Sequence, residues 1–307
     1  MAKIVVIGSL NMDIVALVPR LPSLGETIIG SQYLNNFGGK GANQACAAAK
    51  LGGNVAMLGR VGDDEFGRHM RANLESVGCD VSAVHVTEGR SGVAMILVAD
   101  SGQNSIVVVP GANERYRRSG LYSDTVHLAG AEYALLQLEI PMDTVIAAAE
   151  IAHRRGVKVI LDPAPAPAYL PAPLLEHVDI LTPNETEAAQ LVGRRATHLS
   201  VDEARDIVRQ LHGLGARTVI VKLGDQGCLL HESKTATLIS APQVEVVDTT
   251  AAGDVFNGAL AVARTEGASL PDACRFAVTA AALSVTRVGA QESMPFRTEL
   301  GSDFQQN

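Results

Sequence analysis

Two carboxylates stand six positions apart in the segment VDTTAAGDVFNGALA, residues 247–261, and small residues fill most of the interval between Asp248 and Asp254. Small residues let the backbone approach a ligand closely. The apolar residues that follow recur at helical spacing and predict a helix beginning near Ala252; they are Phe256, Ala259, Leu260 and Ala263. Asp254 then lies in the first helical turn. An acid there can simply cap the helix, because it gains roughly 0.3–1 kcal/mol from the helix dipole.

A second interpretation of the same segment is an anion hole. Backbone N–H groups from Ala251 to Asp254 would face a phosphate, and the carboxylate of Asp254 would act beside them. Both interpretations need the same helix start, so other parts of the chain must distinguish them.

The segment FGGKGANQA, residues 37–45, places Lys40 between glycines and suggests a nucleotide-binding loop. A Walker loop would need Ser or Thr where Gly41 stands, and the dinucleotide fingerprint would need Gly or Ala at Gln44. Neither template fits. The glycines can form nothing more than a tight turn, or they can bring the backbone, Lys40 and Asn43 close to the hydroxyls of a polyol.

Three shorter segments carry polar residues that have two interpretations each. In NMD, residues 11–13, Asn11 and Asp13 share one face of an extended chain, which suits vicinal hydroxyls or a polar strand edge. In TPNETE, residues 182–187, Asn184 and Glu187 form a capping-box pattern, and Glu187 could also bind Mg²⁺ through water. KLGDQG, residues 222–227, could cradle a nucleotide or turn into the next strand.

The elements that would position these residues alternate between strands and helices. Continuous apolar runs predict buried parallel strands; they cover residues 3–8, 54–59, 133–138, 158–162, 179–182 and 218–224. Helices are predicted over 142–155, 185–192 and 201–212, the last opened by a capping box at Ser200 and Glu203. The pattern predicts an α/β fold, a doubly wound, mostly parallel sheet with helices on both faces. Ligands bind beyond the carboxyl ends of such strands, where most of the polar candidates lie.

Two regions, about 11–37 and 91–109, read as strands without intervening helices. The second contains a hairpin turn at residues 100–103. We expect these strands to form a small β-sheet lid that projects from a single α/β domain spanning residues 1–307.

Composition limits the function further. The chain of 307 residues has a net charge of −8, and no cluster of Lys and Arg exceeds two adjacent residues, so we expect no nucleic-acid partner. No apolar run approaches the roughly 18 residues of a membrane span, and we expect a cytoplasmic protein. The cysteines show no metal-binding spacing and are expected to be reduced and buried; they are Cys46, Cys79, Cys228 and Cys274.

Taken together, GSLNMD, FGGKGANQA, TPNETE, LGDQG and DTTAAGD followed by FNGAL resemble the ribokinase family of carbohydrate kinases. The resemblance runs in order from residue 4 to about residue 295. It implies an α/β core with a β lid, a homodimer formed through the lids, and ATP-dependent phosphorylation of D-ribose at its 5-hydroxyl. It also implies that Mg²⁺ and a monovalent cation, normally K⁺, take part.

The resemblance assigns roles to individual residues. Asp254 would be the catalytic base, with Ala251, Ala252 and Gly253 as the anion hole. The sugar would be bound by Asn11, Asp13, Gly39, Lys40, Asn43 and Glu139, besides Asp254. ATP would be contacted by Asn184, Lys222, Leu223, Gly224, Asp225, Gln226, Gly227, Gly253 and Val278. Glu187 would help to place Mg²⁺, and K⁺ would lie among Asp248, Thr250, Ser284, Arg287, Gly289 and Ser293, several of them through backbone carbonyls.

Three positions depart from the family pattern. Ala251 stands where many members carry Gly, which is tolerable if that residue avoids positive φ. Val278 replaces a polar residue and would only pack against adenine, and Lys222 replaces a small hydroxyl and would add a charge near the phosphates. Alternatives with the same fold are a kinase for deoxyribose, fructose or a nucleoside, and a non-catalytic sugar-binding regulator. A dinucleotide oxidoreductase ranks last, because its glycine fingerprint is missing.

Overall fold

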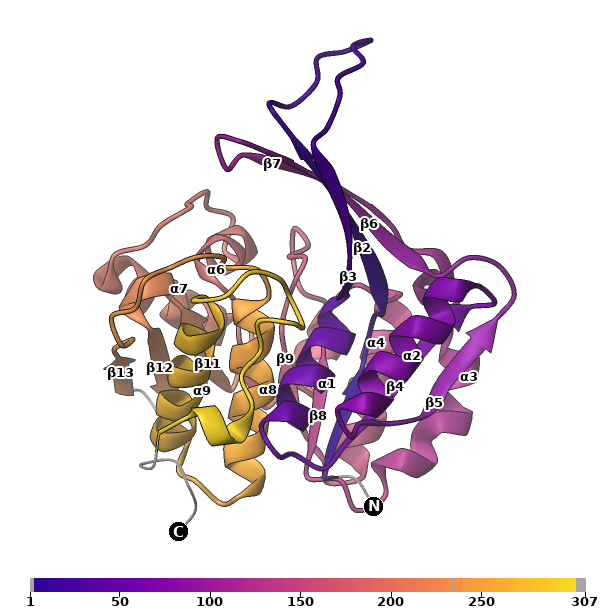
Figure 1. The fold of residues 1–307 in the computed structure, drawn as a ribbon. Coiled ribbons are helices and arrows are strands. Elements are labelled where there is room, and N and C mark those ends of the chain that lie inside the picture. The colour runs from indigo at the N-terminus through magenta and orange to yellow at the C-terminus, as the bar shows by residue number, and fades with distance from the viewer. Residues whose placement is uncertain (1–2, 233–234, 302–307) are drawn as a thin grey trace.

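The computed structural model of the protein describes residues 3–232 and 235–301, which form two β-sheets and their flanking helices (Figure 1). The larger sheet has the strand order β13-β12-β11-β10-β9-β8-β1-β4-β5. Its strands are β1 (Ile4–Ile7), β4 (Val55–Gly62), β5 (Asp80–Thr87), β8 (Tyr133–Leu136), β9 (Lys158–Leu161), β10 (Ile180–Leu181), β11 (Thr218–Lys222), β12 (Cys228–Glu232) and β13 (Thr235–Ile239). Neighbouring strands are parallel from β11 to β5, while β12 and β13 pair antiparallel.

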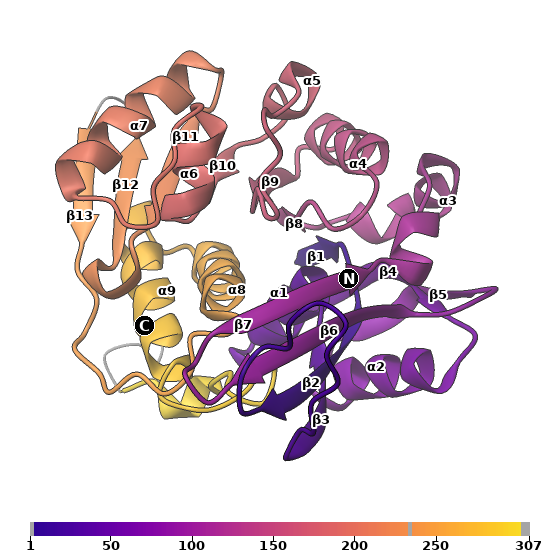
Figure 2. The ribbon, with the colours of Figure 1, turned by 90° about the horizontal axis from the view of Figure 1, so that it is seen from above.

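Helices cover both faces of this sheet, as Figure 2 shows from above. One face packs against α1 (Lys40–Lys50), α2 (Glu65–Ser76), α8 (Ala252–Thr265) and α9 (Leu270–Ser284). The other packs against α3 (Arg118–Asp124), α4 (Met142–Arg154), α5 (Ala172–Leu175), α6 (Glu185–Leu191) and α7 (Val201–Gly213). Each face therefore has its own apolar core, and the predicted doubly wound arrangement is confirmed.

The second sheet has the order β3-β2-β6-β7 and is built from the two regions predicted to form a lid. Its strands are β2 (Asn11–Val18), β3 (Gln32–Gly38), β6 (Gly92–Ala99) and β7 (Asn104–Val109). β2 and β6 run parallel with Asn11 opposite Gly92, so the chain leaves and re-enters the main sheet at one place. Figure 1 shows this sheet projecting away from the body.

Local sequence patterns correctly predicted where α6 and α7 begin. Both capping boxes are present, Asn184 with Glu187 at α6 and Ser200 with Glu203 at α7, so these backbone donors are satisfied as expected. The four cysteines are buried and unpaired. The predicted strands did not include β5 and β13, the two edge strands of the large sheet, because their apolar and polar residues are mixed. In the described parts of the chain, no helix is both long and apolar enough to cross a bilayer.

Candidate active site

The site begins where the loop 247–251 enters α8. Ala251 is the N-cap of this helix and has φ 60° and ψ 9°, the only positive φ outside glycine in the described chain. The condition under which an alanine would be tolerable here, a φ that is not positive, is therefore not met. A side chain in this left-handed conformation costs about 1 kcal/mol, which the surrounding structure must offset.

This tight entry changes the predicted anion hole. The carbonyl of Ala251 accepts hydrogen bonds from the backbone N–H groups of Asp254 and Val255, each at 2.9 Å, and Ala252 N–H donates to Thr249 at 3.3 Å. In residues 3–232 and 235–301, no group accepts a hydrogen bond from the N–H of Ala251 or Gly253. The hypothesis of four free amides is thus corrected to two, because the helix turn itself engages the others.

The carboxylate of Asp254 lies at the bottom of the site and is only 5% exposed. Its Oδ2 accepts a hydrogen bond from Asn43 Nδ2 at 3.0 Å, and its Oδ1 accepts one from Gln44 Nε2 at 3.1 Å. Burial raises the pKa of Asp254 to about 6, although the positive charge of Lys40 and the two amide hydrogen bonds oppose that rise. A carboxylate of this kind can accept a proton near neutral pH.

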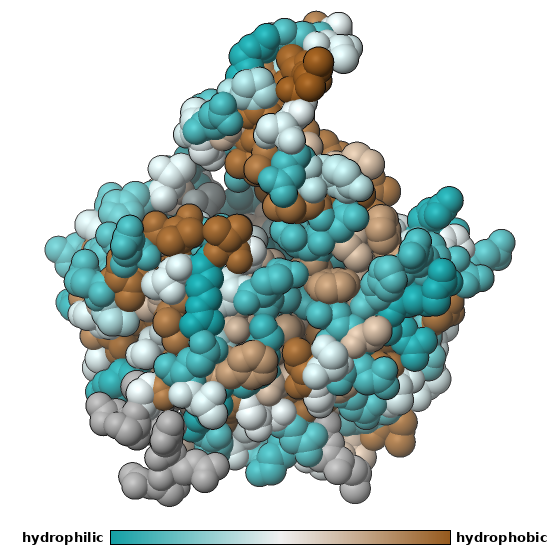
Figure 3. All heavy atoms as spheres, in the orientation of Figure 1, coloured by the Kyte–Doolittle hydropathy of each residue, from teal (hydrophilic) through white to brown (hydrophobic). Residues whose placement is uncertain are grey.

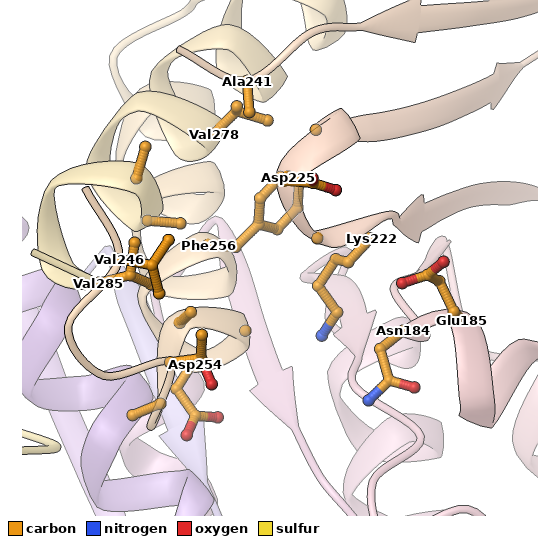
Figure 4. Close-up of a pocket in the computed structure, with 18 of the residues that line it drawn as sticks. Asn184, Glu185, Lys222, Asp225, Ala241, Val246, Asp254, Phe256, Val278 and Val285 are labelled. Atoms are coloured by element: carbon orange, nitrogen blue, oxygen red, sulfur yellow. The ribbon is translucent and has the colours of Figure 1, made fainter. Parts of the chain in front are cut away.

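A cavity of about 540 Å³ opens between α8, α9 and the carboxyl ends of β9 to β11. Figure 4 shows Asn184, Glu185 and Lys222 on one side of it and Val246, Val278 and Val285 on the other, with Asp254 below Val246 and Val285. The polar lining includes Lys40, Asp162, Asn184, Glu187, Lys222 and Asp254. The apolar lining includes Ala241, Val246, Phe256, Val278 and Val285. Such a cavity can hold a ligand with one flat apolar end and one highly charged end.

Lys222 reaches this cavity from the end of β11, and Figure 4 shows its amine directed toward the side where Asp254 lies. Its Nζ is 3.1 Å from Asp162 Oδ1, and both side chains are nearly buried. The same Nζ would lie 3.2 Å from a Cβ added at Gly253. The ammonium group therefore lies close to the backbone of Gly253, whose amide is free.

Two residues of this network were missed by sequence reasoning. Asp162 follows β9 at the same carboxyl edge that indicated the other candidates, so the edge rule could have found it. Gln44 donates from Nε2 to both Asp254 Oδ1 and Asp162 Oδ2, each at 3.1 Å. It was considered only as a mismatch to a fingerprint, and no local pattern predicts that it contacts residues more than 100 positions away.

The residues predicted to bind a sugar gather between Asp254 and the lid. Glu139 Oε2 accepts hydrogen bonds from Ser9 Oγ at 2.5 Å and from the backbone N–H of Lys40 at 3.0 Å. Asn11 is buried and accepts a hydrogen bond from Asn113 at 2.8 Å. Gly39, with φ 86°, is the N-cap of α1, a conformation that favours glycine. Asp13, in turn, packs so closely on Gly38 that a Cβ there would lie 2.2 Å from its Oδ2.

The charges around this group are strongly coupled. Burial, and then the negative charges of Glu139, Glu292 and Asp254, raise the pKa of Asp13 to about 7. For Lys40, burial disfavours the ammonium ion, but the surrounding carboxylates raise its pKa above the usual value. This part of the site thus combines a buried cation with several acids that compete for protons.

This arrangement predicts a pH dependence. Above pH 7 Asp13 is ionised and can accept two hydrogen bonds from hydroxyls, so kcat/KM for the sugar should rise as pH increases through about 7. Asp13→Asn should flatten that rise. Because the folded-state pKa is raised, ionisation destabilises the fold, and the same variant should be more stable than the parent at pH 8, on the order of 1 kcal/mol.

Initial rates at low sugar concentration between pH 5.5 and 8.5, with thermal melts at pH 5 and pH 8, test this expectation. If kcat/KM of Asp13→Asn rose with pH as it does in the parent, the attribution of this rise to Asp13 would be contradicted. The stability gain should shrink at pH 5, where Asp13 is protonated in the parent.

The predicted nucleotide contacts are only partly on the cavity wall. Asn184, Lys222, Gly224, Asp225, Gly227, Gly253 and Val278 line it. Leu223 does not line it and is fully buried, and Gln226 donates from Nε2 to the carbonyl of Leu199 instead. Glu187 lines the cavity while its Oε2 accepts a hydrogen bond from Asn184 N–H at 2.8 Å, so it both caps α6 and faces the cavity. Burial raises its pKa despite the nearby Lys222.

Of the residues predicted to bind a monovalent cation, Asp248, Thr250 and Gly289 contact one another. Asp248 accepts hydrogen bonds from Thr250 N–H at 2.9 Å, from Thr250 Oγ1 at 2.6 Å and from Gly289 N–H at 2.9 Å. The Arg287 guanidinium, which pairs with Glu299, is itself a cation and has no acceptor, so only the backbone carbonyl of Arg287 could bind a cation. Ser284 and Ser293 are buried on the same chain segment. The available donors are oxygens, which suit a hard cation.

The fold and this cavity are typical of an α/β small-molecule kinase. Over residues 1–297 the sequence matches the family model described as pfkB family carbohydrate kinase, and the chain belongs to that family. It is 42% identical to the Haemophilus influenzae protein named Ribokinase, over 96% of this chain and 95% of that one. It is 37% identical to a Salmonella typhi protein named Deoxyribokinase, over 95% of each chain.

The fold is similar to that of a solved relative with bound ligands. The structure described as Arabidopsis thaliana ribokinase complexed with ribose and ATP is matched with a TM-score of 0.92 and 37% identity. The match covers 100% of this chain and 99% of that chain.

Proposed function

We propose that this protein transfers the γ-phosphate of ATP to the 5-hydroxyl of D-ribose, giving D-ribose 5-phosphate and ADP. The observation that carries the proposal is the juxtaposition at the start of α8. There a buried carboxylate, the unpaired amides of Ala251 and Gly253 and the ammonium of Lys222 share one end of a cavity. Similarity to a ribokinase complexed with ribose and ATP supports the choice of both substrates.

In this mechanism Asp254 accepts the proton of the attacking hydroxyl as the phosphoryl group is transferred. Transfer to an alcohol needs in-line positioning and charge neutralisation more than covalent help from the protein. Charge on the γ-phosphate would be stabilised by the backbone amides of Ala251 and Gly253 and by the Lys222 ammonium. Ala252 is the residue between the two amides. The apolar wall around Val246, Phe256 and Val278 would receive adenine.

The sugar would lie between Asp254 and the lid. Asn11, Asp13 and Glu139 offer oxygen acceptors for hydroxyls, and Lys40 and Asn43 offer donors. The backbone near Gly39 allows close approach. Closure of the lid over the sugar would exclude water and limit the hydrolysis of ATP.

Two metal ions belong to the proposal. Mg²⁺, when bound with ATP, neutralises phosphate charge, and Glu187 is the residue we assign to it, through water. K⁺ would be held by oxygens of Asp248 and Thr250 and by carbonyls of the segment 284–293. The hydrogen bonds between Asp248, Thr250 and Gly289 support this second assignment, because they bring the two donor segments together beside Ala251.

We also propose a single domain with an inserted lid, a cytoplasmic location, and a homodimer that buries the lid. Large apolar side chains are exposed on the lid region, which is unusual unless a partner covers them; they include Leu24, Ile29, Tyr33, Met95, Ile106 and Val107. Figure 3 shows the hydrophobic colouring on this projecting part of the molecule.

ADP release in the presence of Mg²⁺, measured with and without K⁺ on a panel of pentoses, hexoses and nucleosides, tests the proposal. D-Ribose should give the highest kcat/KM, and K⁺ should increase it. Preference for 2-deoxyribose would select the alternative suggested by the relative named Deoxyribokinase. Sugar binding without ADP release would instead indicate a non-catalytic sugar-binding regulator.

A further inference from the structure

Both oxygens of the Asp254 carboxylate accept hydrogen bonds from side-chain amides of α1, those of Asn43 and Gln44. A side-chain amide has a donating nitrogen at one end and an accepting oxygen at the other. If either amide turned over, its oxygen would face the carboxylate and repel it. Something must therefore fix the orientation of each amide.

The orientation of Asn43 is fixed by a second buried amide. Gln291, only 3% exposed, donates from Nε2 to Asn43 Oδ1 at 3.1 Å. Its own direction is fixed because its Oε1 accepts from Asn73 Nδ2 at 2.6 Å. Its backbone carbonyl also accepts from Lys50 Nζ at 2.7 Å. The donors therefore point in one direction, from Asn73 through Gln291 and Asn43 to Asp254.

Gln44 contacts a single further amide, that of Gln137, whose own Oε1 has no hydrogen-bond partner among residues 3–232 and 235–301. Gln137, fully buried just after β8, donates from Nε2 to Gln44 Oε1 at 2.7 Å. With its oxygen engaged in this way, Gln44 must direct its NH₂ group at Asp254 Oδ1 and Asp162 Oδ2. Each oxygen of the Asp254 carboxylate thus faces an amide whose oxygen is already occupied by another glutamine.

We propose that Gln291 and Gln137 are positioning residues for phosphoryl transfer, which orient Asn43 and Gln44 so that the Asp254 carboxylate stays ionised and directed at the sugar. This inference rests on the proposed function. Neutral donors suit the task, because they stabilise the carboxylate without supplying a second full charge that would suppress its basicity.

The charged groups around Asp254 make this stabilisation necessary. The groups that face it or its partners are Lys40 from α1, Asp162 after β9, Asp13 from β2, Glu187 from α6 and Lys222 from β11. Burial and Asp162 favour the protonated form of Asp254, which cannot accept the hydroxyl proton, while Lys40 and the two amides favour the ionised form, so loss of the oriented amides would shift Asp254 toward protonation.

Gln291→Met nearly keeps the volume of the side chain but removes both hydrogen bonds. We expect kcat to fall on the order of 10-fold, as for a misoriented catalytic group. The pKa of Asp254 should rise further, so the acid limb of the kcat profile should move to higher pH. Gln291→Glu should also lower kcat and raise the pKa of Asp254. It keeps the oxygen that accepts from Asn73 and loses only the NH₂ group that donates to Asn43. Gln137→Met should move the acid limb in the same direction.

The decisive experiment is a double-mutant cycle on kcat at saturating D-ribose and ATP, with the pH profile of each variant. Because Gln291 acts through Asn43, Gln291→Met should have little further effect in an Asn43→Ala background. An equal loss in both backgrounds, or an unmoved acid limb, would overturn the inference. Gln210→Met, on α7 and outside the site, is the matched control and should leave kcat and the pH profile unchanged.

Urea unfolding of each variant shows whether a loss of kcat comes from the fold, since a purely structural role would lower stability without moving the pH limb. Assays of the parent enzyme distinguish failure of the proposed function from failure of the positioning role. If the parent releases no ADP with any sugar, the proposed function fails. If the parent is active and the Gln291 and Gln137 variants are normal, only the positioning role fails.

Discussion

Asp254→Asn is expected to bind both ATP and D-ribose but to lose at least ~10²-fold in turnover. Asparagine keeps the shape of the side chain and an oxygen that can accept from Asn43 or Gln44. It cannot accept the proton of the attacking hydroxyl. The loss should therefore appear in kcat rather than in the affinity for either substrate.

Calorimetric titration with each substrate and steady-state ADP release measure the two halves of this expectation. Asp63→Asn, a change at an exposed acid outside the cavity, is the matched control and should leave turnover unchanged. Near-normal turnover of Asp254→Asn would refute the role of Asp254 as the base. Because the pKa of the buried Asp254 is raised, the variant should also be more stable than the parent at pH 8.

Lys222→Met is expected to lower both stability and turnover. It leaves the carboxylate of Asp162, which is 2% exposed, without its cation, and breaking a buried ion pair in this way costs about 3–5 kcal/mol. It also removes the positive charge beside Gly253, and the loss of one donor to a transferring group lowers kcat about 10²-fold.

A second variant separates the two effects. Lys222→Met combined with Asp162→Asn removes the buried charge while keeping an acceptor for Gln44, so the urea midpoint should recover much of the loss. Turnover should stay low, because the cation near the phosphate is still absent. Recovery of turnover together with stability would show that Lys222 acts only through the fold.

Much of the fold was predictable because its signals are local. Apolar runs located the central parallel strands, and the polar pairs at Asn184 and Ser200 marked where α6 and α7 begin. The small residues before Asp254 indicated the start of α8 correctly. The edge strands β5 and β13 were missed, because one-sided exposure mixes polar and apolar residues in their sequences.

The candidate site was predictable to the extent that it follows the carboxyl edge of the sheet. The contacts of Gln44 and Gln291 could not be predicted, because each joins residues more than 90 positions apart in sequence. No sequence periodicity indicates such a pair. The φ of Ala251 could not be predicted either. The surrounding loop imposes a left-handed conformation that alanine itself disfavours, and no local sequence rule predicts that conformation for alanine.

The central claim is that a sugar hydroxyl next to Asp254 receives the γ-phosphate of ATP. Phosphorus-31 NMR of a reaction containing the protein, ATP, Mg²⁺, K⁺ and D-ribose tests it directly, because it identifies both products. We expect ADP and one new phosphomonoester, whose coupling to two methylene protons places it on the 5-oxygen. ADP accompanied only by inorganic phosphate, or a phosphate on the anomeric oxygen, would contradict the account.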